Sequence, residues 1–187
     1  MIKIMEVDTQ IIKSSYHISK YDKVFQSICF ILNPKKIVEF GILEGYSLDS
    51  FVNYGGDAII EANDLFDEFP YNSANYDFVI NKYKDYSNLF INKKNFYNSV
   101  DDYEDYSIDI LHIDIANNGD VFEFAIQNYL PKVRGVMILE GGSEERDNVE
   151  WMNKYNKPKI QPVLKKYDND VIITVLKDYP SLTLIKK

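Results

Sequence analysis

Short runs of apolar residues recur along the chain at intervals that suit strands alternating with helices. Seven runs have the length and composition of β-strands, namely Lys36–Phe40, Ala58–Ala62, Asn88–Ile91, Ile108–Ile113, Val133–Leu139, Val171–Leu176 and Leu182–Ile185. Four intervening segments are long enough for a helix, namely Tyr46–Tyr54, Ala74–Tyr83, Lys94–Tyr103 and Val121–Leu130. The central runs are apolar throughout, which is typical of parallel strands with helices on both faces. This pattern predicts a doubly wound α/β fold.

The last two predicted strands break the alternation. Only the segment KDYPS separates Val171–Leu176 from Leu182–Ile185, and it is too short for a crossover helix. We therefore expect a hairpin that places one antiparallel strand in an otherwise parallel sheet. Between the fifth strand and this hairpin, Pro158 and Pro162 are predicted to break any helix in Asn153–Lys166.

The first 34 residues are predicted to form a helical extension. Ser19 lies three residues before Asp22, as in a capping box, and apolar residues follow at helical spacing until Pro34. A chain of 187 residues, 45% of them apolar, can close one sizeable core but not comfortably two. We therefore predict a single domain over residues 1–187.

Composition argues against two classes of partner. A formal net charge of −8 and a pI near 4.8 make the average electrostatic interaction with nucleic acid repulsive. No apolar stretch reaches the roughly 20 residues of a membrane helix, and Glu6 and Asp8 interrupt the region where a signal peptide is apolar. We expect a cytoplasmic protein without nucleic-acid or membrane partners. The single cysteine, Cys29, lies in an apolar segment and is predicted to be a core residue.

The segment VEFGILEGYSL follows the first strand and contains Gly41 and Gly45. Ligands of parallel sheets bind beyond the carboxyl ends of the strands, where glycine permits a sharp turn and the next helix directs unpaired N–H groups at the ligand. A turn that merely needs a positive φ is the alternative. Asp64 follows the second strand, near the offset at which an acid binds the ribose of a nucleotide cofactor. Leu43 occupies the place of the second glycine of the dinucleotide fingerprint, which disfavours a nicotinamide cofactor.

Three stretches together resemble the class I S-adenosylmethionine-dependent methyltransferases, in particular their small-molecule O-methyltransferase branch. VEFGILEGYSL resembles the first motif of that family, and NDLFD resembles the end of its second strand. DILHIDIANNGDVFEFAIQNYLPKVRGVMILEGG resembles its fourth strand, the following helix and its fifth strand. The resemblance runs from about residue 35 to the last residue. It implies a Rossmann-like, mostly parallel seven-stranded sheet with a C-terminal antiparallel hairpin.

The resemblance also implies an activity and the residues that bind the cofactor. The activity is methyl transfer from S-adenosylmethionine to a small polar acceptor, in particular to a hydroxyl of a sugar or another metabolite. The implied cofactor-binding residues are Glu39, Gly41, Gly45 and Ser47 around the methionine part, Asp64 at the ribose, Asn92 or Lys93 beside the adenine, and Asp114. Glu61 is the alternative for the ribose contact.

Two acids are expected at neighbouring strand ends, because Asp114 follows the fourth strand and Glu140 the fifth. The resemblance implies a divalent cation such as Mg²⁺ between them. Without a metal, either acid would act as the general base and Asn117 would orient the acceptor. The match is incomplete. The family frequently has a second acid where this chain has Gly141, and a histidine and a tyrosine where it has Asn117 and Gly119.

Several of these residues also have purely structural interpretations. Asp114 would then cap the following helix, and Glu140 would begin a loop. His112 alternates with apolar neighbours and is predicted to be a hydrogen-bonded core histidine rather than a catalyst. Arg146 in GGSEERDNVEW is predicted to lie on a solvated helix.

Two other functions remain as alternatives to catalysis of methyl transfer. A non-catalytic module that binds S-adenosylmethionine or a nucleoside would explain the incomplete acceptor side. A nicotinamide-dependent oxidoreductase is disfavoured by Leu43 and by the terminal hairpin. The expected partner is a small-molecule acceptor, and a homodimer is left open.

Overall fold

The computed structural model describes Tyr16 and residues 21–68, 73–178 and 180–187. Of the helical extension predicted over residues 1–34, the described part contains Tyr16 and helix α2 (Asp22–Leu32). Ser19 and the rest of that extension lie outside the described residues. The strands are β1 (Lys36–Phe40), β2 (Ile59–Asp64), β3 (Leu89–Lys93), β4 (Ile108–Ile113), β5 (Val133–Glu140), β6 (Ile172–Leu176) and β7 (Leu182–Lys186).

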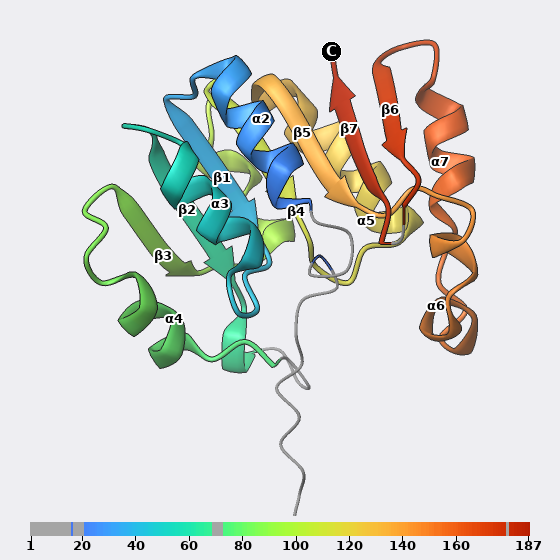
Figure 1. The fold of residues 1–187 in the computed structure, drawn as a ribbon. Coiled ribbons are helices and arrows are strands. Elements are labelled where there is room, and N and C mark those ends of the chain that lie inside the picture. Colours follow the sequence, from blue (N-terminus) through green and yellow to red (C-terminus); the bar gives the residue numbers. More distant parts are fainter. Residues whose placement is uncertain (1–15, 17–20, 69–72, 179) are drawn as a thin grey trace, which may run out of the picture.

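All seven strands belong to one sheet with the order β3-β2-β1-β4-β5-β7-β6 (Figure 1). Strands β1 to β5 pair in parallel, whereas β7 is antiparallel to both β5 and β6. The predicted fold class and the predicted terminal hairpin are therefore confirmed. The order reverses at β1, which places the edge beyond β1 and β4 at the position where doubly wound sheets bind ligands.

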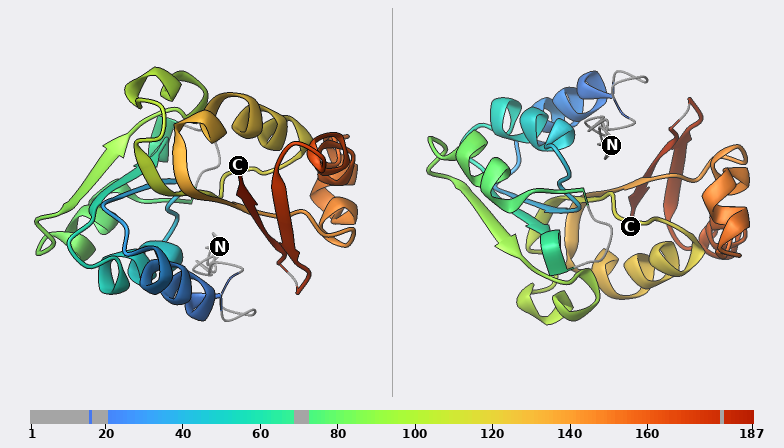
Figure 2. Two further views of the ribbon diagram at one scale, coloured as in Figure 1. Left: turned by 90° about the horizontal axis from the view of Figure 1, so that it is seen from above. Right: turned by 90° about the horizontal axis from the view of Figure 1, so that it is seen from below.

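Helices cover both faces of the sheet, as Figure 2 shows along two directions. One face carries α2 (Asp22–Leu32), α3 (Tyr46–Tyr54) and α4 (Tyr76–Tyr83), and the other carries α5 (Gly119–Phe124), which packs against α7 (Ile160–Tyr167). The short helix α6 (Glu150–Lys154) precedes α7. Within the described ranges, no helix has the length and apolarity needed to span a membrane.

The two faces have separate apolar cores because side chains alternate along each strand. Val38 and Leu111 face the core under α5, whereas Ile37 and Ile110 face the core under α2 and α3. Strand register pairs Glu39 with His112, so both polar side chains are buried on the α2 and α3 side. Cys29 is buried as predicted, and burial raises the pKa of its thiol to about 11.

The segment Lys94–Tyr103 does not form the helix that its length permits. It contains two 3₁₀ turns, Phe96–Asn98 and Val100–Asp102. The Asn95 side chain accepts a hydrogen bond from the Tyr97 N–H at 2.9 Å, and the Ser99 hydroxyl donates to the Asn95 carbonyl at 2.8 Å. These local bonds compete with the helical ladder and favour turns.

The prediction that prolines break any helix in Asn153–Lys166 is wrong, because α7 begins at Ile160. Pro162 lies in its first turn, where a missing N–H leaves no helical bond unmade. The Asp147 carboxylate accepts the Ile160 and Gln161 N–H groups at 2.7 and 2.8 Å and so caps the helix from a distant segment.

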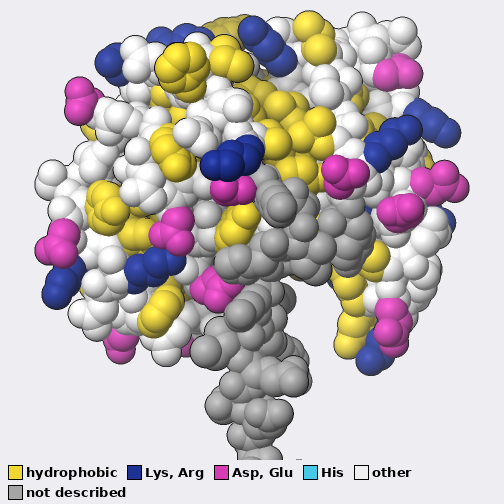
Figure 3. Space-filling view, viewed as in Figure 1, with side chains coloured by type: hydrophobic (Ala, Val, Ile, Leu, Met, Phe, Trp, Pro, Cys, Tyr) yellow, Lys and Arg dark blue, Asp and Glu magenta, His cyan; other side chains and the backbone are white. Residues whose placement is uncertain are grey.

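The surface shown in Figure 3 carries charges of both signs, and apolar side chains gather near the centre of this face. Lysines and arginines are interspersed with acids on this face and form no continuous basic stripe. Phe30 and Ile31 on α2 are the most exposed large apolar side chains of the described residues, at 86% and 76%.

Candidate functional site

A cavity of about 650 Å³ lies at the carboxyl ends of β1, β2 and β4. Its size suits a nucleoside-sized ligand. The loops that follow β1, β2, β3 and β4 supply most of its wall, and Lys157 contributes from the segment between α6 and α7. The lining residues are Phe40, Gly41, Ile42, Leu43, Tyr46, Ser47, Asn63, Asp64, Leu65, Ser73, Lys94, Asn95, Phe96, Tyr97, Asp114, Ile115, Ala116, Asn118, Val121 and Lys157.

The two glycines of the loop after β1 are required by packing against the protein itself. Gly41 has a φ of +91°, and a Cβ there would lie 1.9 Å from the Asp114 carbonyl oxygen. Gly45 has a φ of +86°, and a Cβ there would lie 2.1 Å from the Tyr83 hydroxyl. Gly41 lines the cavity and Gly45 does not. The glycines therefore bring the loop close to the β4 edge and to α4, and this position shapes the cavity.

Asp64 is the last residue of β2 and lines the cavity. Its two carboxylate oxygens accept the Ile42 and Phe66 N–H groups, both at 2.8 Å, so the acid also ties the glycine loop to β2. Glu61, the alternative for the ribose contact, instead forms an ion pair with Lys36 at 2.8 Å and is absent from the cavity wall.

Glu39 lies behind the cavity wall and is fully buried. Its Oε1 accepts hydrogen bonds from the Ser47 hydroxyl at 2.5 Å and from His112 Nδ1 at 2.8 Å. Ser47 itself lines the cavity, so Glu39 orients a hydroxyl that faces the ligand space. Its second oxygen, Oε2, has no hydrogen-bond partner among the described residues.

Asn92 does not line the cavity. It pairs with Asn63 across β2 and β3, and its amide donates to the Asn63 side-chain oxygen at 3.1 Å. The wall beyond β3 is formed by the next residues along the chain, which include Phe96 and Tyr97. Their rings lie 5.1 Å apart in an edge-to-face arrangement and present an aromatic surface where the sequence predicts the adenine.

Asp114 follows β4 directly and lines the cavity. Burial raises the pKa of its carboxyl group to about 7, and the charges of Glu140 and Glu39 act in the same direction. His112 and Arg146 oppose them by lowering the pKa, although they do not cancel the increase. A carboxylate of this kind on a cavity wall can exchange a proton near neutral pH.

Glu140 is the last residue of β5 and is buried, but it is absent from the cavity wall. Its two oxygens accept hydrogen bonds from Arg146 Nε at 2.6 Å and from Arg146 Nη2 at 2.8 Å. Arg146 is itself buried, so the prediction that it lies on a solvated helix is wrong. The reason is the buried acid, which requires a compensating cation.

Asn117 is fully buried and is also absent from the cavity wall. Its amide nitrogen donates to the carbonyls of Ile113 and Glu140 at 2.8 and 2.9 Å, and its side-chain oxygen accepts the Ile115 N–H at 3.3 Å. These bonds join the loop after β4 to the end of β5. The side chain therefore supports the position of Asp114 and faces no ligand.

The ligand set predicted for a divalent cation does not fit this arrangement. The guanidinium of Arg146 occupies both oxygens of Glu140. Among the residues that the structure describes, no group of three or more His, Cys, Asp or Glu side chains could hold a metal ion. Hard cations need several oxygen ligands. The metal at Asp114 and Glu140 stays a prediction for which the observed side chains offer no site.

Sequence reasoning missed part of the site. Tyr16 reaches the end of β4 from the N-terminal segment, and its ring lies 5.9 Å from that of His112. Asn118 and Lys157 line the cavity, although no motif singles them out. Phe96 and Tyr97 could have been found from the aromatic run NFYN after the third strand, which is suited to an adenine.

No protein-family model matches the sequence, and a search of curated proteins gives no match. Solved structures match the fold. TomG, an O-methyltransferase from Streptomyces achromogenes involved in tomaymycin synthesis and solved with SAM, has a TM-score of 0.66 at 14% identity over 89% of this chain and 79% of that chain. An O-methyltransferase from Bacillus cereus solved with SAH has a TM-score of 0.64 at 18% identity over 90% of this chain and 81% of that chain.

A third solved methyltransferase also shares the fold. Precorrin-6y C5,15-methyltransferase from Geobacter metallireducens has a TM-score of 0.60 at 14% identity over 90% of this chain and 88% of that chain. The chain thus has the Rossmann-like fold of methyltransferases, as the motifs predict. At these identities the likeness shows the fold alone, so the reaction has to be argued from the side chains of the cavity.

Proposed function

We propose that this protein transfers a methyl group from S-adenosylmethionine to a hydroxyl of a small polar acceptor, with Asp114 as the general base. The observation that carries the proposal is the placement of Asp114 on the wall of the cavity beside the glycine loop, with its pKa raised to about 7. A base is most effective when its pKa lies near the working pH. Two solved structures that share the fold hold SAM or SAH, which supports the choice of cofactor.

The side chains around the cavity fit this cofactor. Asp64 would accept the ribose hydroxyls, and Phe96 and Tyr97 would border the adenine. At the other end, Ser47 lines the cavity and donates to Glu39, whose carboxyl group lies behind the wall and complements the positive ammonium group of a methionine moiety. S-adenosylmethionine supplies a methyl group bound to a positively charged sulfur, which makes that carbon electrophilic.

The presence of a carboxyl group, that of Asp114, on the cavity wall favours an oxygen atom as the methyl acceptor. A hydroxyl must lose its proton as its oxygen bonds to the methyl carbon, and a positioned carboxylate removes that proton. Asn118 and Lys157 add polar groups to the same cavity, which favours a polar acceptor.

A non-catalytic cofactor-binding module is the second candidate. The observation that favours it is the engagement of Glu140 and Asn117 in the protein interior, which leaves Asp114 as the single residue of that predicted trio on the cavity wall. Binding of the cofactor without turnover on any acceptor would support this candidate. Self-association is not part of either proposal.

Calorimetry with S-adenosylmethionine, S-adenosylhomocysteine and NAD, followed by turnover on a panel of hydroxylated metabolites, tests the proposal. We expect binding of the first two ligands and methyl transfer to at least one acceptor. Binding of NAD alone would refute the methyltransferase function and favour an oxidoreductase.

Residue variants locate the ribose contact in the same calorimetric assay. Asp64→Asn should weaken S-adenosylhomocysteine binding by about 1.5 to 3 kcal/mol, the range for a hydrogen bond to a charged group. Glu61→Gln is the matched control, because Glu61 pairs with Lys36 away from the cavity, and its affinity should change less than about two-fold. A loss confined to Glu61→Gln would move the ribose contact to that residue.

A further inference from the structure

Lys157 lines the cavity from the segment between α6 and α7. Its side chain is exposed and makes no ion pair or hydrogen bond with the residues that the structure describes. The ammonium group of Lys94, which also lines the cavity, instead pairs with Asp102 at 2.8 Å. Of these two lysines, Lys157 therefore keeps its charge available to a ligand.

The backbone around Lys157 is held in place by contacts with the rest of the protein. The Lys157 N–H donates to the carbonyl of Met152 at 2.8 Å, and the Met152 side chain is buried. The next carbonyl along the chain, that of Pro158, accepts the Gly119 N–H at 2.7 Å. A Cβ at Gly119 would lie 2.5 Å from the Lys159 carbonyl oxygen, so the two segments are in close contact. The fold thus fixes the place on the wall from which the Lys157 side chain extends.

The sheet order separates Lys157 from the residues that would hold the cofactor. The glycine loop, Asp64 and Phe96 lie at or after the ends of β1, β2 and β3, whereas the segment that carries Lys157 follows β5. In the order β3-β2-β1-β4-β5, the end of β4 with Asp114 lies between these two groups. The part of the wall around Lys157 is therefore left for the methyl acceptor.

We propose that Lys157 binds an anionic group of the acceptor, a carboxylate or a phosphate, and so makes the protein selective for small hydroxylated anions. This inference rests on the proposed function, because it takes the ligand at this part of the wall to be the acceptor. A lysine ammonium group binds either anion as a compact charge with three donors. Lys157 determines specificity in this scheme and takes no part in the proton transfer.

The charges of the cavity would also orient such an acceptor. Asp114 repels an anionic group and Lys157 attracts it, so the anionic end is directed to the lysine and the hydroxyl end to the base. The whole chain has a formal net charge of −8, which disfavours the approach of an anion on average. A local cation on the cavity wall is therefore needed to hold an anionic acceptor.

Calorimetry on the protein saturated with S-adenosylhomocysteine tests this selectivity without any turnover. Two pairs of probes differ mainly in charge, namely para-hydroxybenzoate with its amide and glucose 6-phosphate with glucose. We expect the charged member of at least one pair to bind about ten-fold more tightly, the low end of the range for a hydrogen bond to a charged group. The pair that shows this preference identifies the anion as a carboxylate or a phosphate. Equal affinities within both pairs, or no binding of either charged probe, would overturn the proposal.

Lys157→Gln tests whether this side chain causes the preference. Glutamine keeps a polar side chain but has no charge, so the preference for the charged probe should fall below about two-fold, whereas Lys157→Arg should retain most of it. Lys154→Gln is the matched control. It changes the net charge equally, but Lys154 is absent from the cavity wall and its ammonium group lies 5.0 Å or more from the Tyr155 ring centroid, at 5.4 Å. An unchanged preference in Lys157→Gln, or an equal loss in Lys154→Gln, would overturn the proposal.

Kinetics with an active acceptor give a second readout. Lys157 contacts a part of the acceptor that does not react, so Lys157→Gln should raise the KM of the anionic acceptor about ten-fold while kcat changes little. The affinity for S-adenosylhomocysteine should stay within about two-fold. A lower kcat with an unchanged KM would contradict a role in acceptor binding.

The calorimetry also separates failure of this inference from failure of the proposed function. If S-adenosylhomocysteine binds but neither charged probe is preferred, the selectivity is refuted and the methyltransferase proposal stands. If S-adenosylhomocysteine does not bind, the methyltransferase proposal fails, and the same probes are titrated into the free protein. Tighter binding of a charged probe there, lost in Lys157→Gln, would support the anion site independently, and its absence would overturn it.

Discussion

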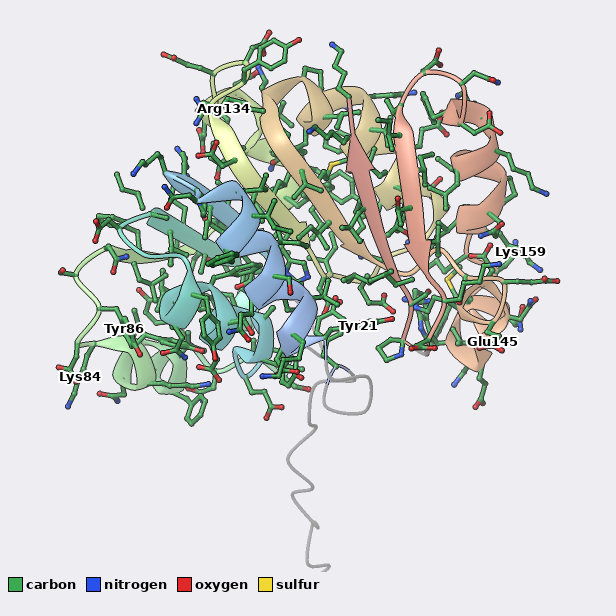
Figure 4. All side chains as sticks on the ribbon, turned by 45° about the horizontal axis from the view of Figure 1, so that its top comes forward. Tyr21, Lys84, Tyr86, Arg134, Glu145 and Lys159 are labelled. Atoms are coloured by element: carbon green, nitrogen blue, oxygen red, sulfur yellow. The ribbon has the colours of Figure 1, made fainter. Side chains whose placement is uncertain are left out.

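The two ends of β4 each carry an aspartate, and the protein treats the two carboxyl groups in opposite ways. Asp109 lies at the amino end, where it accepts the Lys35 and Lys36 N–H groups at 2.7 and 3.0 Å and is paired with Arg134. Asp114 lies just past the carboxyl end, on the cavity wall. Figure 4 shows Arg134 near the amino ends of the central strands and Tyr21, at the start of α2, toward their carboxyl ends.

The pKa values of the two acids follow from these partners. Burial acts to raise the pKa of Asp109, but the bonds from Lys35 and Lys36 and the Arg134 guanidinium together hold it below its usual value. Burial also raises the pKa of Asp114, and the nearby acids add to the increase, so it reaches about 7. A paired carboxylate stabilises the fold, whereas one held near like charges costs stability and gains reactivity.

Glu140 offers a second comparison, among the carboxyl ends of the strands near the cavity. It lies at the end of β5, next to β4, but Arg146 neutralises it with two hydrogen bonds. Of the two acids at adjacent strand ends, Glu140 is neutralised in a buried ion pair, whereas Asp114 can gain and lose a proton near neutral pH. The end of a strand alone therefore does not make an acid functional.

The largest expected effect is on turnover in Asp114→Asn. The amide has nearly the same shape but cannot accept the acceptor's proton, so kcat should fall about 10²- to 10⁴-fold, the range for general acid–base catalysis. The affinity for S-adenosylhomocysteine should remain within a few-fold. Asp120→Asn is the control, because Asp120 is exposed on α5 and absent from the cavity wall. A folded Asp114→Asn protein with full turnover would remove Asp114 from the reaction and with it the contrast between the two ends.

A smaller effect is expected on stability in Asp109→Ala. Loss of the carboxylate leaves the Lys35 and Lys36 N–H groups and Arg134 without their acceptor, so the free energy of unfolding should fall by about 2 to 3 kcal/mol. Urea titration at pH 7 measures this change. Asp105→Ala is the matched control, since Asp105 pairs with Lys132 at the surface with its side chain 63% exposed, and it should cost at most about 0.5 kcal/mol. Equal losses in both variants would show that burial at the amino end confers no special stability.

The smallest expected effect is on the pH dependence of stability. Because folding raises the pKa of Asp114, the folded protein binds more protons than the unfolded chain between about pH 4 and pH 7, so this residue makes stability fall as pH rises through that window. Asp114→Asn should remove that decline and be at least as stable as the parent at pH 8. Asp109 has the opposite sign, and its contribution should be lost only as pH falls below about 4. Parallel stability curves for the parent and Asp114→Asn between pH 4 and pH 8 would contradict the raised pKa.

The fold class, the terminal hairpin and the edge of the sheet at which the cavity lies could all be predicted from the sequence. The alternation of strands and helices and the apolar runs are local properties of the sequence, because they follow from the repeat of the backbone. The glycines after β1 indicate a turn with positive φ angles, which glycine adopts readily. For the same reason, the chain positions of Asp64 and Asp114 at strand ends could be read directly from the pattern.

The contacts of these side chains, in contrast, could not be predicted from the sequence, because they form between segments that folding brings together. Arg146 is drawn into the interior by Glu140, Asp147 caps α7 from a separate segment, and Tyr16 meets His112 across 96 positions of sequence. Such partners depend on which segments pack together, and no local periodicity records that choice. The difference between a neutralised acid and a reactive one is therefore a property of the folded chain, because the energy of a buried charge is set by its nearest neighbours in space.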